Sequence, residues 1–330
     1  PAASPDFTLR AITPEALAPA LEAESAHVFD LSQDLPLHSV LFRLSGDEHV
    51  LLLVLHHIAG DGASLAPLAS DLAEAYRAHL NGLAAILPPP TVQYADYALW
   101  QRDLLGDAAD PDSLAARQAG FWTATLTGAP QQVTLLPDHP RPAVAAHRGA
   151  RIPLGIDAAT HQALDALASR HGATMFMVLH AALAMTMQRS GCGDDIVIGT
   201  ALAGRQDDLL QDMVGFFVNT LALRSRIDAD RSMADLLDGV RDADLSAFDN
   251  QDLPFDQIVD RLVPDRSLAV NPLFQVFLVL QNAAPAALSL PGLSVELIDS
   301  GLDAAKFDLT LDLAESRDQA GRAAGIEGVL

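Results

Sequence analysis

Segments with the pattern of strands and segments with the pattern of helices alternate along the whole chain of 330 residues. Apolar runs such as 49–55 and 196–201 are typical of buried strands. The segments between them, such as 65–80, place leucines and other apolar side chains at helical spacing. This alternation predicts the α/β fold class.

The predicted elements follow from these patterns. The expected strands are 39–45, 49–55, 150–154, 196–201, 216–227, 273–280, 294–298 and 307–313. One expected helix begins at Pro14 after a Thr13 cap, and the others cover 65–80, 92–105, 113–126, 158–170, 174–188 and 233–248. Because 49–55 is continuously apolar, we expect this strand to be buried on both faces. Ser64 is expected to cap the helix that follows.

The strongest local break is the run of three prolines at 88–90. We therefore expect residues 1–88 to be the remainder of an N-terminal lobe, 89–145 to be linker helices and 146–330 to be a C-terminal lobe. Pro1 is not a natural first residue, so the chain is expected to be a piece of a longer protein.

Composition excludes several classes of function. The 20 basic and 43 acidic residues give a net charge of −23, which argues against nucleic acid and against anionic membrane surfaces as partners. The single Cys192 excludes a disulfide framework and fits a reducing, cytoplasmic compartment. The most apolar segment, 173–187, is shorter than the roughly 20 residues of a membrane span.

The segment that points to chemistry is His56-His57-Ile58-Ala59-Gly60-Asp61-Gly62, which follows the apolar strand 49–55. Successive side chains of a strand face opposite ways, so we expect one histidine to be catalytic and the other to pack or to hold backbone. Asp61 can orient an imidazole or tie the loop to a distant arginine. Free amides at the start of the next helix suit an oxyanion, and together these groups suit acyl transfer.

Two other interpretations of this segment exist. A histidine followed four residues later by an aspartate often occurs without function. A metal site would use His56, His57 and Asp61, but adjacent histidines rarely bind one ion, so no metal is predicted. The remaining histidines fit surface or cap positions, among them His79, His139, His161 and His171.

The chain also resembles a known family, the condensation domains of nonribosomal peptide synthetases, which are related to chloramphenicol acetyltransferase. Their His-His-x-x-x-Asp-Gly motif is matched by His56, His57, Asp61 and Gly62. The further matching segments, in order, are 93–102 (QYADYALWQR), 198–205 (IGTALAGR), 214–220 (VGFFVNT), 251–255 (QDLPF), 271–276 (NPLFQV) and 306–309 (KFDL). Asn250 and Ala63 depart from the family pattern, which often has histidine and tryptophan there.

The resemblance implies two chloramphenicol-acetyltransferase-like lobes, each an α+β two-layer sandwich, that form a V-shaped pseudo-dimer with a central tunnel. It implies that His57 is the catalytic histidine, that Asp61 is structural and pairs with an arginine, which can lie in the missing N-terminal segment, and that Gly62 lies close to the reacting thioester. The other residues that it assigns to substrate binding or to the tunnel are His56, Ala63, Asn219 and Arg205. Asn219 can equally satisfy backbone, and Arg205 can equally lie on the surface.

The implied reaction is amide formation between an acyl or peptidyl thioester donor and an aminoacyl acceptor. Both would arrive on the 4'-phosphopantetheine arms of peptidyl carrier proteins, next to an adenylation domain, and the domain itself would bind no cofactor. The N-terminal part of the family pattern is missing, and the rest looks most like the subtype with a D-configured donor. The alternatives are a free-standing acyltransferase that uses coenzyme A thioesters and a non-catalytic recruitment platform.

Overall fold

The computed structural model describes residues 6–133, 135, 137–263, 265, 267–281, 287–298, 300 and 304–330. The chain divides into two compact units. As far as these ranges are described, the first comprises Pro1–Tyr97, Gly204–Phe217 and Pro285–Asp303, and the second comprises Ala98–Ala203, Val218–Ala284 and Ala304–Leu330. The units are therefore not the consecutive segments 1–88, 89–145 and 146–330 expected from the sequence. The loop Gly204–Phe217 joins the first unit because it hydrogen-bonds to Asp61 and Ser64.

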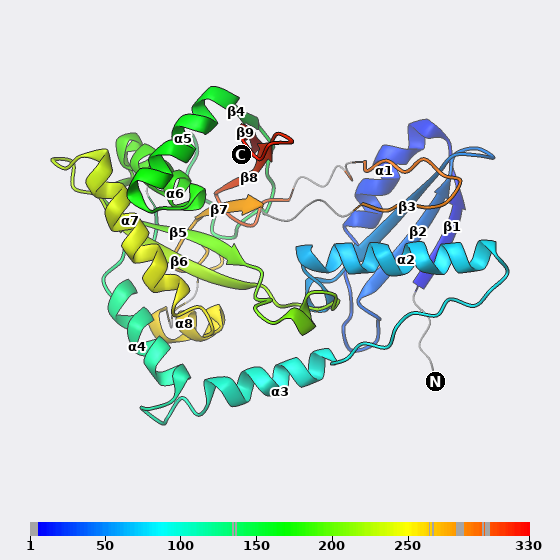
Figure 1. The fold of residues 1–330 in the computed structure, drawn as a ribbon, viewed down its shortest axis with the longest axis horizontal. Helices are drawn as coiled ribbons and strands as arrows, with labels where there is room; N and C mark the ends of the chain where they lie inside the picture. The colour runs from blue at the N-terminus through cyan, green and yellow to red at the C-terminus, as the bar shows by residue number, and fades with distance from the viewer. Residues whose placement is uncertain are drawn as a thin grey trace. The chain divides into compact units, whose positions relative to one another are not determined.

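The first unit contains a three-stranded sheet in the order β1 (Asp6–Ala11), β2 (Leu37–Arg43) and β3 (His49–Leu55), drawn in Figure 1 beside α1 (Pro14–Ser25). Strand β1 runs parallel to β2, and β2 runs antiparallel to β3. Pro14 starts α1, where a missing backbone N–H costs nothing. A small core forms between this helix and one face of the sheet, and it consists of Leu21, Val40 and Phe42 with neighbouring apolar groups.

The prediction that strand 49–55 is buried on both faces is wrong. In β3 the alternate residues His49, Leu51 and Leu53 are exposed, with Leu51 at 39% and Leu53 at 40%. The register places Leu51 opposite Leu41, and Leu41 opposite Leu9, which is also exposed. One face of this three-stranded sheet is therefore apolar but uncovered by the residues that the structure describes.

Helix α2 (Leu65–Leu80) follows the 3-10 turns His57–Ala59 and Gly62–Ser64, and α3 (Tyr94–Leu105) contains the boundary between the units. The second unit holds a six-stranded sheet in the order β4-β9-β8-β7-β5-β6. These strands are β4 (Pro153–Ile156), β5 (Asp195–Leu202), β6 (Asn219–Arg226), β7 (Val276–Gln281), β8 (Leu309–Arg317) and β9 (Ala323–Val329). Strand β7 is parallel to β5 and β8, and the other pairs are antiparallel.

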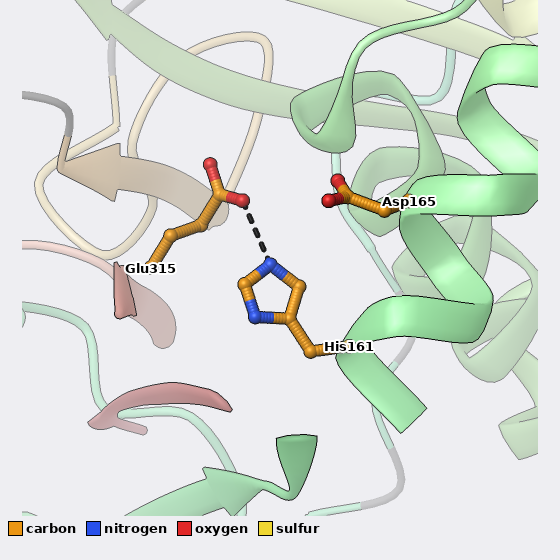
Figure 2. Close-up of side chains that lie close together, drawn as sticks. All are labelled: His161, Asp165 and Glu315. Carbon is orange, nitrogen blue, oxygen red and sulfur yellow. Dashed lines mark hydrogen bonds and ion pairs between the residues drawn. The ribbon is translucent and has the colours of Figure 1, made fainter. Parts of the chain in front are cut away.

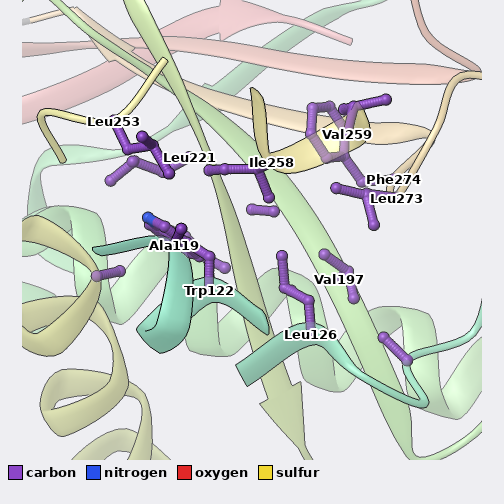
Figure 3. Packing of buried hydrophobic residues seen from close by; sticks show 14 of the residues in the cluster. Ala119, Trp122, Leu126, Val197, Leu221, Leu253, Ile258, Val259, Leu273 and Phe274 are labelled. Atoms are coloured by element: carbon purple, nitrogen blue, oxygen red, sulfur yellow. The ribbon is translucent and has the colours of Figure 1, made fainter. Parts of the chain in front are cut away.

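Helices pack on both faces of this larger sheet. They are α4 (Leu114–Leu126), α5 (Ala158–His171), α6 (Met175–Met187), α7 (Met233–Phe248) and α8 (Phe255–Leu262). Because strand side chains alternate, Val197 of β5 packs with α4 and α8, while Ile196 and Ile198 pack with α6. Figure 3 shows the first of these clusters, where Trp122 and Leu126 of α4 lie near Ile258 and Val259 of α8.

Several sequence predictions need correction. Residues 294–298, predicted as a strand, have no regular structure, and β1, β9 and α8 were not predicted. Ser64 does not cap α2 through its side chain; the Asp61 carboxylate accepts the Ser64 amide instead. Among the described residues, no helix is long and apolar enough to cross a membrane.

Candidate functional site

The histidine pair lies where β3 ends. Strand β3 stops at Leu55, His56 begins a 3-10 turn over His57–Ala59, and Gly60 leads into a second turn over Gly62–Ser64. Because the strand has ended, the alternation that would send adjacent side chains to opposite faces no longer applies. The backbone of this loop therefore decides where each imidazole lies.

His57 is exposed, and its tautomer follows from one contact. Its Nδ1 lies 3.0 Å from the carbonyl oxygen of Gly60, which can only accept. Nδ1 therefore carries the hydrogen, and in a neutral imidazole Nε2 keeps a free lone pair. Nε2 has no hydrogen-bond partner among the described residues. This atom can therefore accept a proton or a hydrogen bond from a substrate.

His56 has the opposite arrangement. Its Nδ1 accepts the amide N–H of Ile58 at 3.1 Å, and its ring packs edge-on against Phe29, with centroids 5.8 Å apart. A neutral His56 therefore carries its hydrogen on Nε2. This histidine holds the turn backbone, whereas its neighbour leaves a ring nitrogen available.

Asp61 and Arg205 form a buried ion pair that fixes the loop. Arg205 Nη2 lies 2.9 Å from Asp61 Oδ1, and the two side chains are 2% and 0% exposed. The amide of Phe217 donates to Asp61 Oδ2 at 3.0 Å, and the guanidinium lies over the Phe217 ring, 4.3 Å from its centroid. The arginine that pairs with Asp61 is thus Arg205, which is buried and does not lie on the surface.

Competing effects act on the Asp61 carboxyl. Burial raises its pKa, but hydrogen bonds from the Phe217 amide, Ser64 and Arg205, together with the Arg205 charge, outweigh burial and lower the pKa. Asp61 therefore stays ionised at neutral pH. An ionised group that accepts from three different residues is suited to hold a loop and poorly suited to exchange protons.

Ser64 connects the two loops of the site. Its fully buried hydroxyl oxygen accepts from Arg205 Nη2 at 2.8 Å and from the Gly215 amide at 3.1 Å, and it lies 2.8 Å from Asp61 Oδ1. Gly204 has a φ of +66°, and a Cβ there would lie 1.9 Å from the Phe217 carbonyl oxygen. This close packing accepts only glycine at that position. The sequence predicted only a helix-capping role for Ser64, which lies two residues after the motif.

Asn219, predicted as a substrate or tunnel residue, lies in the second unit at the start of β6. Its side-chain nitrogen donates to the carbonyls of Gln251 and Leu253 at 2.7 and 2.9 Å, and its oxygen accepts the amide of Phe255 at 3.1 Å. The amide group thus satisfies backbone at the start of α8. The other predicted site residues lie together in the first unit, where Ala63 is half-buried and Gly62 is exposed.

One cluster in the described residues has the composition of a metal site: His161, Asp165 and Glu315. Figure 2 shows His161 Nε2 directed at Glu315, 2.8 Å from Oε1, and the amide of Gly325 donates to Nδ1 at 3.1 Å. Arg317 bridges Asp165 and Glu315 at 3.0 and 2.7 Å. Both ring nitrogens and both carboxylates are thus engaged by protein groups. His161, predicted at the surface, is fully buried because it joins α5 to β8 and β9.

Comparisons with known proteins identify the family of the chain. A family model for the condensation domain matches residues 8–321. The chain is 47% identical over 323 residues to a nonribosomal peptide synthetase of Salinispora arenicola, covering 97% of this chain and 4% of that protein. It is 45% identical over 328 residues to the dimodular nonribosomal peptide synthase of Bacillus subtilis, covering 99% and 14%. The chain thus spans a small part of these relatives.

Solved structures share the fold. The X-domain from teicoplanin biosynthesis superposes with a TM-score of 0.93 at 35% identity, covering 99% of this chain and 73% of that one. The first condensation domain of the calcium-dependent antibiotic synthetase superposes with a TM-score of 0.71 at 18% identity, covering 100% and 72%, which supports the fold alone. Condensation domains of nonribosomal peptide synthetases catalyse amide bond formation, an acyltransferase-type reaction. The chain belongs to the condensation domain family of nonribosomal peptide synthetases.

Proposed function

We propose that this chain joins a carrier-bound acyl or peptidyl thioester donor to a carrier-bound aminoacyl acceptor, with His57 at the reacting centre. The observation that carries the proposal is the single tautomer of His57: Nδ1–H donates to the Gly60 carbonyl, and Nε2 is left for the substrate. A loop held by a buried ion pair presents this nitrogen.

The proposed step needs only modest general acid–base catalysis. The acceptor amine attacks the thioester carbonyl, the new carbon–nitrogen bond forms, and the carbon–sulfur bond breaks to release the donor thiol. A free α-amino group has a pKa near 8, so an appreciable fraction is already neutral at neutral pH. His57 Nε2 accepts a hydrogen bond from the amine, takes its proton and allows that proton to reach the leaving sulfur. Orientation of the amine toward the thioester accounts for much of the remaining rate enhancement.

Gly62 fits a role beside the thioester. A Cβ built at this exposed position meets no atom within 4 Å, so the described residues leave space for a larger side chain. Its φ also lies outside the left-handed region that favours glycine. We propose that the approaching phosphopantetheine arm, rather than the fold, requires glycine here. Ala63, the next residue, is proposed to line the same donor path.

Asp61, Arg205 and Asn219 are proposed to act structurally, because every one of them is held by protein contacts. Peptidyl carrier proteins and a neighbouring adenylation domain are the proposed partners, and the pantetheine arms are proposed to be the only cofactor-derived groups at the site. The tunnel between the lobes, the cytoplasmic compartment and the D-configured donor stay predictions. Neither the coenzyme A-dependent acyltransferase nor the recruitment platform is favoured by the family match.

The test is peptide formation between two loaded carrier proteins, measured in the full-length protein. His57→Ala is expected to abolish the product while leaving the melting temperature unchanged, because His57 is exposed and makes one hydrogen bond. His79→Ala, an exposed histidine at the end of α2, is the matched control and should keep full activity. Undiminished product from His57→Ala would disprove the assignment.

A further inference from the structure

Phe216 is placed unlike its neighbour Phe217. The Phe217 ring is buried under the Arg205 guanidinium, whereas Phe216 is 38% exposed. The Phe216 ring packs edge-to-face on the His57 imidazole, with centroids 5.0 Å apart and planes at 73°. This geometry is the favourable one for two aromatic rings. An aromatic side chain that contacts the reactive histidine and otherwise faces outward is poorly explained by core packing.

The backbone on both sides of Phe216 is fixed by side chains from other segments. The Ser64 hydroxyl contacts both the amide and the carbonyl of Gly215, at 3.1 and 2.9 Å. The Tyr94 hydroxyl donates to the Phe216 carbonyl at 2.7 Å, and the next amide, that of Phe217, donates to Asp61 at 3.0 Å. Successive peptide groups are therefore anchored, which fixes the direction in which the Phe216 side chain leaves the backbone.

The Tyr94 contact depends on close packing. A Cβ on residue 215 would lie 2.6 Å from the Tyr94 ring and 2.7 Å from the Phe217 ring, so glycine is needed for Tyr94 to approach. Burial, and to a lesser extent the charge of Asp61, raise the pKa of Tyr94, so its hydroxyl remains a donor at neutral pH. The hydroxyl therefore serves as a permanent anchor for the Phe216 carbonyl.

We propose that Phe216 is a positioning residue for His57 and that Tyr94 acts through it. The inference rests on the proposed function of His57. One hydrogen bond to Gly60 leaves the imidazole able to pivot about its Cβ–Cγ bond, and the ring of Phe216 closes off one side of that motion. Nδ1 then stays on the Gly60 carbonyl, and Nε2 stays directed to the substrate.

Kinetics in the full-length protein give the first test. Tyr94→Phe removes one hydroxyl and keeps the ring, so we expect kcat to fall about threefold to tenfold, the range of one hydrogen bond, with KM nearly unchanged. Phe216→Leu should lower kcat at least as much, and Phe216→Tyr, which keeps the ring, should restore most of it. Tyr76→Phe on α2 is the control, because the Tyr76 hydroxyl has no hydrogen-bond partner among the described residues and should change neither constant.

The second readout does not depend on activity. In the chain labelled with ¹⁵N-histidine, the nitrogen shifts of His57, assigned by their loss in His57→Gln, should report the Nδ1–H tautomer in the wild type. In Phe216→Leu they should move toward the averaged values of a mobile imidazole. If His57→Ala kept activity, the proposed function would fail, yet the tautomer shift would still decide the role of Phe216. Unchanged shifts together with unchanged kcat in Phe216→Leu would overturn the inference.

Discussion

The Asp61–Arg205 ion pair offers the sharpest stability prediction. Asp61→Asn keeps the size of the side chain but removes the charge, and it leaves the Arg205 guanidinium buried at 2% exposure without its counter-ion. Breaking a buried pair by removal of one partner costs about 3 to 5 kcal/mol. The loop Gly204–Phe217 is where this loss should appear, because Arg205 and the Phe217 amide both bind Asp61.

Hydrogen exchange of the peptide that contains the Phe217 amide measures this loss locally. At about 1.4 kcal/mol per tenfold, the expected cost corresponds to an exchange rate higher by roughly two to nearly four powers of ten. Asp165→Asn is the matched control, because its ion pair with Arg317 is 34% and 41% exposed and should be worth less than about 1 kcal/mol. Equal exchange of the Phe217 amide in Asp61→Asn and wild type would show that the Asp61–Arg205 ion pair does not hold this loop.

Two further measurements separate charge from packing. Arg205→Met added to Asp61→Asn removes the unpaired charge, so part of the protection should return. The pKa of Asp61 is lowered in the folded chain, so its contribution is fully present above the ordinary aspartate value of about 3.9 and is lost as pH falls through the lower, folded value. Protection of the loop should therefore be flat from neutral pH to about pH 5 and fall only in stronger acid, and Asp61→Asn should lack that fall.

Three other predictions concern single positions. Gly62→Ala should leave the melting temperature unchanged and lower peptide formation, and full activity would contradict a thioester beside Gly62. Gly215→Ala should increase hydrogen exchange of the first unit, because its Cβ would collide with two aromatic rings. In its control, Gly239→Ala in α7, the new Cβ meets nothing within 4 Å. This variant should raise the free energy of unfolding by about 0.5 to 1 kcal/mol. Asn219→Ala should lower the free energy of unfolding, measured in urea, by about 1 to 3 kcal/mol for each carbonyl left unpaired. A decrease below about 0.5 kcal/mol would argue that water replaces the Asn219 side chain at these carbonyls.

Local signals in the sequence are enough for the elements with strong patterns. Strand β3 and helix α7 have the predicted bounds, because β3 is a continuous apolar run after His49 and α7 begins with a capping box between Ser232 and Asp235. Strand β9 was missed because its Ala-Ala-Gly start has low strand propensity. Its Gly328 is needed for packing, since a Cβ there would lie 2.0 Å from the Asp312 carbonyl oxygen.

For the candidate site too, local sequence signals located some residues but not their long-range contacts. The motif located His57 and Asp61, but the sequence had no means to pair Asp61 with Arg205, 144 positions away. Residues 216–227 were predicted as a strand, and only the three-dimensional position of the Phe216 ring beside His57 distinguishes Phe216 from Phe217. The prediction that β3 is buried on both faces was wrong for a similar reason, because a continuous apolar run does not reveal whether a second layer covers the strand.

The most direct test of the proposed function follows the acyl group from the donor carrier to the acceptor carrier. A donor carrier protein loaded with an acyl thioester and an acceptor carrier loaded with an aminoacyl thioester are mixed with the full-length protein, and both carriers are followed by intact-protein mass spectrometry. We predict that the acceptor carrier gains the mass of the donor acyl group as the donor carrier loses it, and that His57→Ala stops both changes. Loss of the acyl group from the donor with no gain on the acceptor would contradict the proposed amide formation between the two carriers.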